Sequence, residues 1–175
     1  KWMEKAGVDK KKLFHYSHYS KIKKNKFNII YLGYFWSNWS LKKNGVIASL
    51  HGLNLRLDKF SNTQDIKGVT ALDEDWVIIN QMIKYYKYGF GRVSDYINED
   101  IRNKIINRDD AIKILEKYDG NCSEEYVDSF CKYLGISKKF FWKIVKKFTN
   151  KKLFKVNNLS RPVRIFKVGI GLNGK

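Results

Sequence analysis

The alternation of apolar and polar positions is clearest in the last third of the chain. Apolar residues recur there at helical spacing after serine or asparagine caps, which predicts helices over 107–118, 123–135 and 137–148. Asn107 and Asp110 form a start resembling a capping box. We expect the apolar stripes of these helices to meet in a small bundle. The stripe residues are Val127, Phe130, Cys131 and Leu134 in one helix and Phe141, Ile144, Val145 and Phe148 in the next.

Two more helices are predicted earlier in the chain, over 40–52 and 73–87. The first begins after Ser40 and ends at Gly52, and both are residue types favoured at those ends. The candidate core positions are Leu41, Gly45, Ile47, Ala48 and Leu50 in the first helix and Trp76, Ile79, Met82 or Ile83, and Tyr86 in the second. Residues 54–72 are polar without a clear period, so we expect a loop there.

Strand-forming residues gather near both ends of the chain. Phe27–Leu32 is a short apolar run bounded by Gly33, which predicts a buried strand. The aromatic segment Tyr34–Trp39 follows it, at the strand end where open α/β sheets bind ligands. Near the C-terminus, Val163–Ile170 is predicted to be an edge strand.

The chain carries a large excess of positive charge. Its 175 residues include 35 Lys and Arg against 17 Asp and Glu, a formal net charge of +18. This balance is typical of proteins that bind nucleic acid, anionic membranes or phosphorylated ligands. Lysine accounts for 29 of the cations and arginine for 6, whereas base reading and two-pronged phosphate binding favour arginine. A solvated basic surface is therefore favoured, and a basic helical module that binds nucleic acid through the lysine face at 138–147 is the alternative.

Metal, disulfide and membrane chemistry find little support in the sequence. Cys122 and Cys131 are nine residues apart with no second pair, which matches no zinc spacing and favours reduced thiols in the cytoplasm. No apolar run reaches the ~18 residues of a membrane span. No nucleophile elbow or metal-binding histidine pattern occurs, so no catalytic or metal residue is predicted. The chain begins with Lys1, and we expect it to be one piece of a longer polypeptide.

The densest mixture of reactive residue types is Tyr85–Asp95. Gly89 is interpreted as a helix C-cap and Gly91 as part of a tight turn. A phosphate-binding loop is a poor match, because Ser94 occupies the third glycine position and no strand precedes the segment. Two interpretations of the charges that follow stay open, an internal salt-bridge network and a ligand site. These charges are Arg92, Asp95, Asp100 and Arg102.

The run Lys84-Tyr-Tyr-Lys-Tyr-Gly-Phe-Gly-Arg-Val-Ser-Asp95 carries a family resemblance. Further matching segments are Trp36–Gly52, Asp100–Asn103, Asn107–Ile112, Lys117–Gly120, Tyr133–Gly135, Phe140–Val145 and Asn150–Phe154. In these segments the chain resembles the N-acetyl sugar amidotransferases. These are ATP-pyrophosphatase, or PP-loop, enzymes of surface-polysaccharide (LPS or capsule), flagellin-glycan and nonulosonic acid biosynthesis. The resemblance covers roughly residues 27–170.

The resemblance implies a mainly α chain. It would be a C-terminal helical bundle that follows the last strands of a Rossmann-like α/β PP-loop domain, whose N-terminal half is absent. The implied divisions are residues 1–56 as the tail end of the nucleotide-binding-type domain, 57–72 as a connecting loop and 73–175 as the C-terminal helical domain. The family's S-G-G-x-D-S loop and N-terminal cysteine cluster do not occur here, so we expect the chain alone to be inactive.

The family's reaction implies the substrates and partners. ATP, with Mg, activates the amide oxygen of an N-acetyl sugar as an adenylated imidate. Ammonia from a separate glutaminase subunit then displaces AMP and leaves an acetamidino group. The acceptor would be a free or nucleotide-linked N-acetylated sugar, and the missing N-terminal half would bind most of the ATP. The helices described above would close over the acceptor.

The same resemblance assigns an acceptor-binding set. Its members are Lys87, Tyr88, Gly89, Phe90, Gly91, Arg92, Asp95, Arg102 and Trp36. Arg92 or Lys87 would bind an anionic sugar through charge-assisted hydrogen bonds. Tyr34, Trp36 and Phe90 would pack against a sugar face, and Asp95 would accept bonds from sugar hydroxyls. We expect these groups to converge on one cavity beside the aromatic segment.

Overall fold

The computed structural model describes residues 5–9, 11, 28–32, 35–36, 39–158 and 160–171. The chain divides into two compact units, Lys1–Asn38 and Trp39–Lys175. Every helix and strand named below lies in the second unit. The domain divisions expected at residues 56 and 72 stay predictions.

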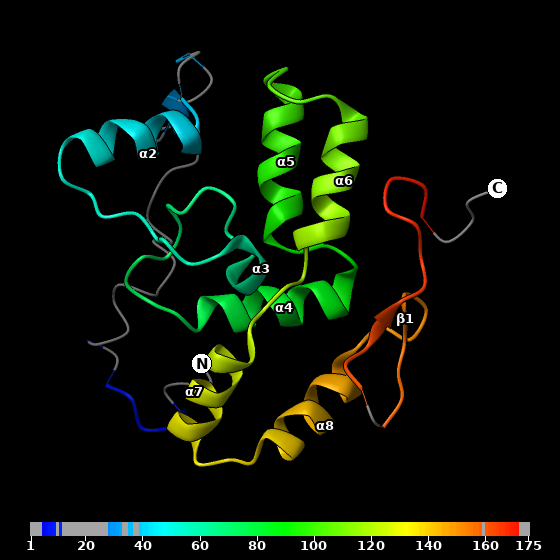
Figure 1. Cartoon of the computed structure of the whole chain (residues 1–175). Helices are drawn as coiled ribbons and strands as arrows, with labels where there is room; N and C mark the ends of the chain where they lie inside the picture. The colour runs from blue at the N-terminus through cyan, green and yellow to red at the C-terminus, as the bar shows by residue number, and fades with distance from the viewer. Residues whose placement is uncertain are drawn as a thin grey trace. The chain divides into compact units, whose positions relative to one another are not determined.

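The second unit is built from helices and one small hairpin (Figure 1). The helices are α2 (Leu41–Leu50), α3 (Phe60–Thr63), α4 (Val77–Tyr88), α5 (Arg92–Arg102), α6 (Arg108–Tyr118), α7 (Glu124–Leu134) and α8 (Lys138–Phe148). The strands are β1 (Phe154–Lys155) and β2 (Val163–Arg164), which pair antiparallel with Phe154 opposite Arg164. The predicted mainly α architecture is therefore confirmed.

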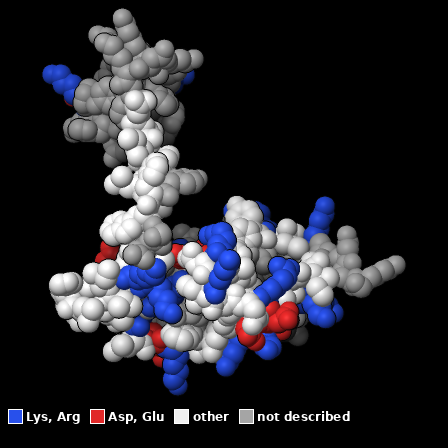
Figure 2. Space-filling view, turned by 90° about the horizontal axis from the view of Figure 1, so that it is seen from above, with Lys and Arg blue, Asp and Glu red and all other residues white. Residues whose placement is uncertain are grey.

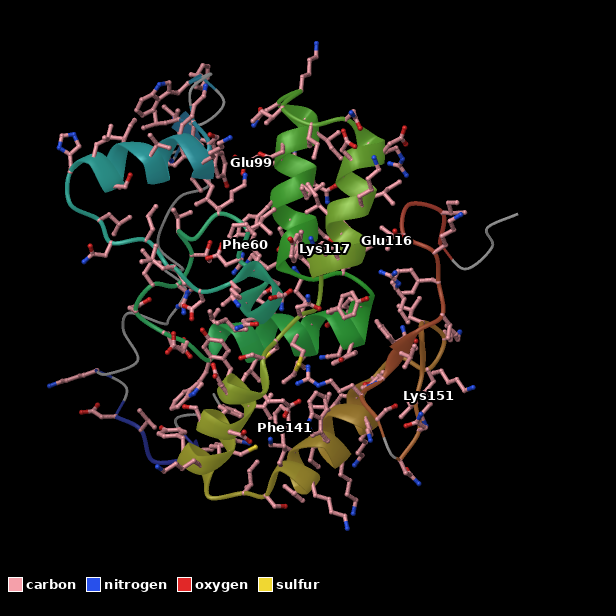
Figure 3. The ribbon with its side chains drawn as sticks, in the orientation of Figure 1. Phe60, Glu99, Glu116, Lys117, Phe141 and Lys151 are labelled. Carbon is pink, nitrogen blue, oxygen red and sulfur yellow. The ribbon has the colours of Figure 1, made fainter. Side chains whose placement is uncertain are left out.

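The larger core lies where α4 meets α7 and α8. Buried residues from all three helices and from β1 form it, among them Ile79, Met82, Val127, Phe141 and Phe154. Phe141 points into the space between α7 and α8 (Figure 3). Phe154 is 1% exposed and packs edge-on against the rings of Tyr85, Tyr86 and Phe166. Each such ring pair contributes about 0.5–1.5 kcal/mol beyond the buried area, so Phe154, with Leu153 and Phe166 packed beside it, holds the hairpin against the bundle.

A second core joins α5 to α6, which run side by side in opposite directions (Figure 1). Val93 and Ile97 are buried against Ala111, and Ile101 continues the same stripe one turn later. This i, i+4 spacing is the signature of a helix with one apolar face. The helix α5 was not predicted, although this signal was present in the sequence.

The predicted helix ends are largely confirmed. The side chains of Ser40, Asn107 and Ser137 accept bonds from the backbone N–H three residues later. Gly135 ends α7 with a left-handed φ of 64°. Ser123 occupies the cap position of α7, but its buried hydroxyl has no hydrogen-bond partner among the described residues.

Two predictions about strands are wrong. Residues 28–32 form no strand, and Ile29, Ile30, Tyr31 and Leu32 are exposed. A strand needs a partner for its backbone ladder, and in the described part of the chain only β1 and β2 pair as named strands. Phe27, Gly33 and Tyr34 lie outside the described residues. The predicted strand 163–170 is reduced to β2, because β1 offers only two residues for pairing.

Two apolar stripes are also only partly buried. The helix α2 packs through Gly45, where Val69 leaves no room for a side chain, and this turns Ile47 and Leu50 towards solvent. In α8, Ile144 and Phe148 remain exposed and line an open apolar groove of about 560 Å³ between α4, α7 and α8. Residues 54–72, predicted as a loop, contain the short helix α3.

On the face shown in Figure 2, positive and negative charges are interspersed. Figure 2 shows Lys and Arg side chains scattered over the second unit in that view, with carboxylates among them. Within the described ranges, no helix has the length and apolar character needed to cross a membrane.

Candidate functional site

The two glycines of the Tyr85–Asp95 segment join α4 to α5. Gly89 ends α4 with a φ of 84°, a left-handed conformation that favours glycine. Gly91 is extended, but a Cβ atom there would lie 2.6 Å from Gln64 Oε1 and 2.7 Å from Asp119 Oδ1. The predicted C-cap at Gly89 is confirmed, and Gly91 is required by the close approach of the buried Gln64 and the half-buried Asp119 side chains.

Those two side chains satisfy the start of α5. Asp119 accepts hydrogen bonds from the backbone N–H groups of Gly91 (3.0 Å) and Val93 (3.1 Å). Gln64, which is 0% exposed, accepts from the N–H of Arg92 at 3.2 Å. Free N–H groups at a helix start are what binds phosphate in a phosphate loop. Here the chain's own oxygens already occupy them.

The charges after Gly91 pair with lysines from other elements. Asp95 Oδ2 lies 2.8 Å from Lys84 Nζ, and Asp100 Oδ1 lies 2.9 Å from Lys67 Nζ. Arg92 stacks over the ring of Tyr96 at 5.8 Å. Of the two interpretations left open, internal ion pairing describes Asp95 and Asp100, but their partners are lysines: no ion pair joins Arg92 or Arg102 to either acid among residues 39–158.

Arg92 borders a narrow polar hollow between α4, α5 and the residues around α3. Asp65, Thr70 and Gln81 share its walls, and Gln81 Oε1 is buried with no partner in the described part of the chain. The Tyr96 hydroxyl forms a short hydrogen bond with Thr70, and burial raises the pKa of Tyr96. The hollow has a volume of about 10 Å³, too small for a sugar ring.

A larger pocket lies on the other side of the junction. Its volume is about 220 Å³, and it is lined by α4, α5, the end of α6 and the segment after β2. Its polar groups include the Tyr85 and Ser94 hydroxyls, the Asp119 carboxylate and the Arg164 guanidinium, with Phe166 as an aromatic wall. This pocket brings a carboxylate, two hydroxyls and a cation together beside Gly89.

The electrostatics of this pocket are set by burial and by Arg164. Burial raises the pKa of Asp119, and hydrogen bonds from Ser94 Oγ (2.7 Å) and the backbone oppose that rise. Burial likewise raises the pKa of Tyr85, against the attraction of Arg164. A carboxylate has about four acceptor positions, and donors of Gly91, Val93 and Ser94 already occupy those of Asp119. A ligand hydroxyl that binds Asp119 would have to displace one of these donors, and the Ser94 hydroxyl is the one that lines the pocket.

The other predicted site residues lie apart from this pocket. Lys87, Tyr88 and Phe90 are exposed, with Lys87 over the Tyr88 ring at 5.3 Å and the Phe90 ring 6.2 Å from Tyr88. Arg102 is exposed at the far end of α5. Trp36 belongs to the first compact unit, so its expected place beside the motif stays a prediction.

Sequence reasoning missed Asp119 and Arg164 as pocket residues. Asp119 lies in the resemblance segment Lys117–Gly120 but was given no role, and Arg164 was predicted only as part of the edge strand Val163–Ile170. Their meeting depends on contacts between residues more than 25 positions apart, for which no local pattern exists. The predicted burial of Cys131 is confirmed, and Cys122 is buried as well. In the described ranges no three His, Cys, Asp or Glu gather as metal ligands, while His15 and His18 lie outside them.

Comparison with known proteins places the helical unit in a family. Residues 55–168 match the model of the LPS biosynthesis protein WbpG-like, C-terminal domain. No curated protein and no solved structure matched the chain. The match spans more than half of the chain and includes α3 to α8 and the β hairpin. The chain therefore belongs to the WbpG-like LPS biosynthesis proteins, whose C-terminal domain it carries.

Proposed function

We propose that this chain is the acceptor-side portion of an ATP-dependent N-acetyl sugar amidotransferase of LPS biosynthesis. The complete enzyme would convert an acetamido group to an acetamidino group with ammonia from a separate glutaminase. The match of residues 55–168 to an LPS-biosynthesis domain supports the pathway. The resemblance at Lys84–Asp95 supports the reaction class.

The start of α5 does not fit the phosphates of ATP with Mg. The start of α5, the nearest candidate for phosphate binding, is filled by Asp119 and Gln64. The proposal therefore leaves nucleotide binding to residues outside this domain and derives no chemical step from it here.

One observation carries the acceptor role, the 220 Å³ pocket beside Gly89. Sugar recognition needs hydroxyl and carboxylate groups that exchange hydrogen bonds with ring hydroxyls, and an aromatic wall for the ring face. Ser94 and Asp119 supply the hydroxyl and carboxylate groups, and Phe166 supplies the aromatic wall. Arg164 adds a cation for a phosphate or carboxylate on the acceptor. In this assignment Arg92 stabilises the hollow beside Tyr96, and Arg164 takes the ligand-binding role first expected of Arg92.

The test is steady-state kinetics of the complete polypeptide that carries this domain, with a glutaminase partner and an N-acetylated sugar. In Arg164→Gln we expect KM for the sugar to rise about tenfold with kcat nearly unchanged, because a charge-assisted contact is lost. Lys155→Gln is the matched control, since Lys155 is exposed on the neighbouring strand. Equal KM values in the two variants would exclude this pocket as the acceptor-binding site. If mass spectrometry detects no amidino product, the proposed amidotransferase reaction is wrong.

A further inference from the structure

A second concavity lies between α8 and the segment 156–161 that follows β1. Its volume is about 800 Å³, within the ~300–1,000 Å³ typical of small-molecule sites. Five cationic side chains and one carboxylate line it, with Trp142 among them. We call this concavity the basic groove. It shares no lining residue with the pocket beside Gly89.

Three of its lysines lie on one face of α8. Lys139, Lys143 and Lys146 are spaced i, i+4 and i+7, and the sequence of α8 contains no acidic residue. Like charges at this spacing destabilise a helix by a few tenths of a kcal/mol per pair. An anion bound along the stripe would relieve that repulsion. At ~1.5 Å of rise per residue, the stripe is about 10 Å long.

The remaining charges of the groove are already engaged. Lys138 Nζ lies 3.1 Å from Glu124 and 2.6 Å from Asp128. Arg161 pairs with Glu124 and donates to the Cys122 carbonyl oxygen at 2.9 Å. On the lysine stripe, Lys146 donates to the Asn158 carbonyl oxygen at 3.2 Å. Among the described residues no carboxylate forms an ion pair with its three lysines, and Glu124 and Asp128 close one end of the stripe.

The groove also holds a fixed aromatic ring. Phe141 and Tyr86 contact Trp142 edge-on, with ring centroids 5.3 Å and 6.4 Å away. The Arg161 guanidinium stacks over the Trp142 ring at 4.8 Å. A half-buried Trp with a stacked Arg forms a flat, partly polar wall on which a ring or a chain of apolar carbons can lie.

We propose that the basic groove binds a small molecule carrying two adjacent phosphates joined to an organic group. The diphosphate lies along Lys139, Lys143 and Lys146, and the organic group packs on the Trp142–Arg161 wall. The short stripe and the carboxylates at its end favour a compact diphosphate over a continuous polyanion such as nucleic acid, which would have to pass Glu124 and Asp128. This site does not depend on the amidotransferase assignment.

The test is calorimetric titration of the chain at fixed low salt. The probes are inorganic phosphate, inorganic pyrophosphate, UDP, geranyl diphosphate and a single-stranded oligonucleotide. We expect UDP or geranyl diphosphate to bind more tightly than pyrophosphate, and pyrophosphate more tightly than phosphate. UDP binding would identify a nucleotide as the source of the diphosphate, and geranyl diphosphate binding would identify a lipid carrier.

The matched variants remove two charges each. Lys139→Gln with Lys143→Gln should weaken diphosphate binding at least about tenfold, whereas Lys151→Gln with Lys152→Gln removes the same charge from exposed positions outside the groove and should change it less than about twofold. Equal losses in both variants would overturn the groove as the site. Equal affinities for phosphate and pyrophosphate would contradict the proposal that the groove recognises two adjacent phosphates. An oligonucleotide that binds more tightly than every diphosphate would favour the nucleic-acid interpretation instead.

Discussion

The α4–α5 junction and the basic groove on α8 differ in a way that their sequences do not predict. The junction mixes aromatics, glycines and charges, yet its N–H groups and carboxylates are satisfied within the chain by Asp119, Gln64 and Lys84. The groove arises from a plain lysine-rich helix, and its lysine stripe has no carboxylate of its own. The start of α5 and the carboxylate of Asp95 are thus satisfied by the chain itself, whereas the lysine stripe of a simple amphipathic helix has no paired carboxylate among the described residues.

The largest expected effect tests the first half of this comparison. Asp119→Ala should lower the free energy of unfolding by about 4 kcal/mol, because two backbone N–H groups and the Ser94 hydroxyl lose their acceptor in a buried site. Asp109→Ala is the control, since Asp109 lies exposed in the first turn of α6 and should cost less than about 1 kcal/mol. Urea denaturation measures both, and equal losses would show that the junction does not depend on Asp119.

A smaller effect is expected at Gly91. Gly91→Ala should cost about 2 kcal/mol, because the added Cβ would displace Gln64 or Asp119. Gly135→Ala separates this contact from backbone strain: Gly135 has a φ of 64° and open space around its Cβ position, so it should cost about 1 kcal/mol. If Gly135→Ala proves the more costly of the two in urea denaturation, the close approach at Gly91 is not what requires glycine.

The core behind both regions should respond to alkaline pH. Burial raises the pKa of Cys122 to about 12 and that of Tyr86 to about 12. The folded chain therefore keeps protons that the unfolded chain releases from about pH 9 upwards. Stability should fall as pH rises through this window, by about 2 kcal/mol between pH 8 and pH 10. Denaturation at several pH values measures the slope, and Cys122→Ala should flatten it; an unchanged slope would contradict the role of this thiol.

The smallest expected effect concerns the lysine stripe without ligand. Lys139→Gln with Lys143→Gln should raise the free energy of unfolding by about 0.6 kcal/mol, because the repulsions Lys139–Lys143 and Lys143–Lys147 at i, i+4 and Lys143–Lys146 at i, i+3 are removed. The gain should shrink as salt screens the charges. Thermal denaturation at low and high salt measures it. A loss of stability would mean that the two lysines already have stabilising partners.

Local signals in the sequence predicted most of the helical unit. The caps at Ser40, Asn107 and Ser137 and the stop at Gly135 depend on residues within one turn, and all four lie as expected. The helix α5 was not predicted, because its apolar stripe of Val93, Ile97 and Ile101 is narrow and the other positions of the helix are mostly charged or polar.

The candidate sites could not be predicted in the same way. Gln64 reaches Gly120 across 56 positions of sequence, and Arg161 reaches Cys122 across 39. Contacts of this kind depend on tertiary packing, which no local period encodes. The assignment of Arg92 followed from its place in the motif, whereas Arg164, in a weak strand signal, lines the ligand-sized pocket.

The segment after β1 makes the protein sensitive to proteolytic cleavage near its C-terminus. Arg161 completes the basic groove, while Arg164 and Phe166 complete the pocket beside Gly89. A protease cut near residue 160 would thus disable two recognition surfaces at once and still leave α2 to α8 uncut. Helical content alone would then be a poor gauge of whether a shortened protein remains competent.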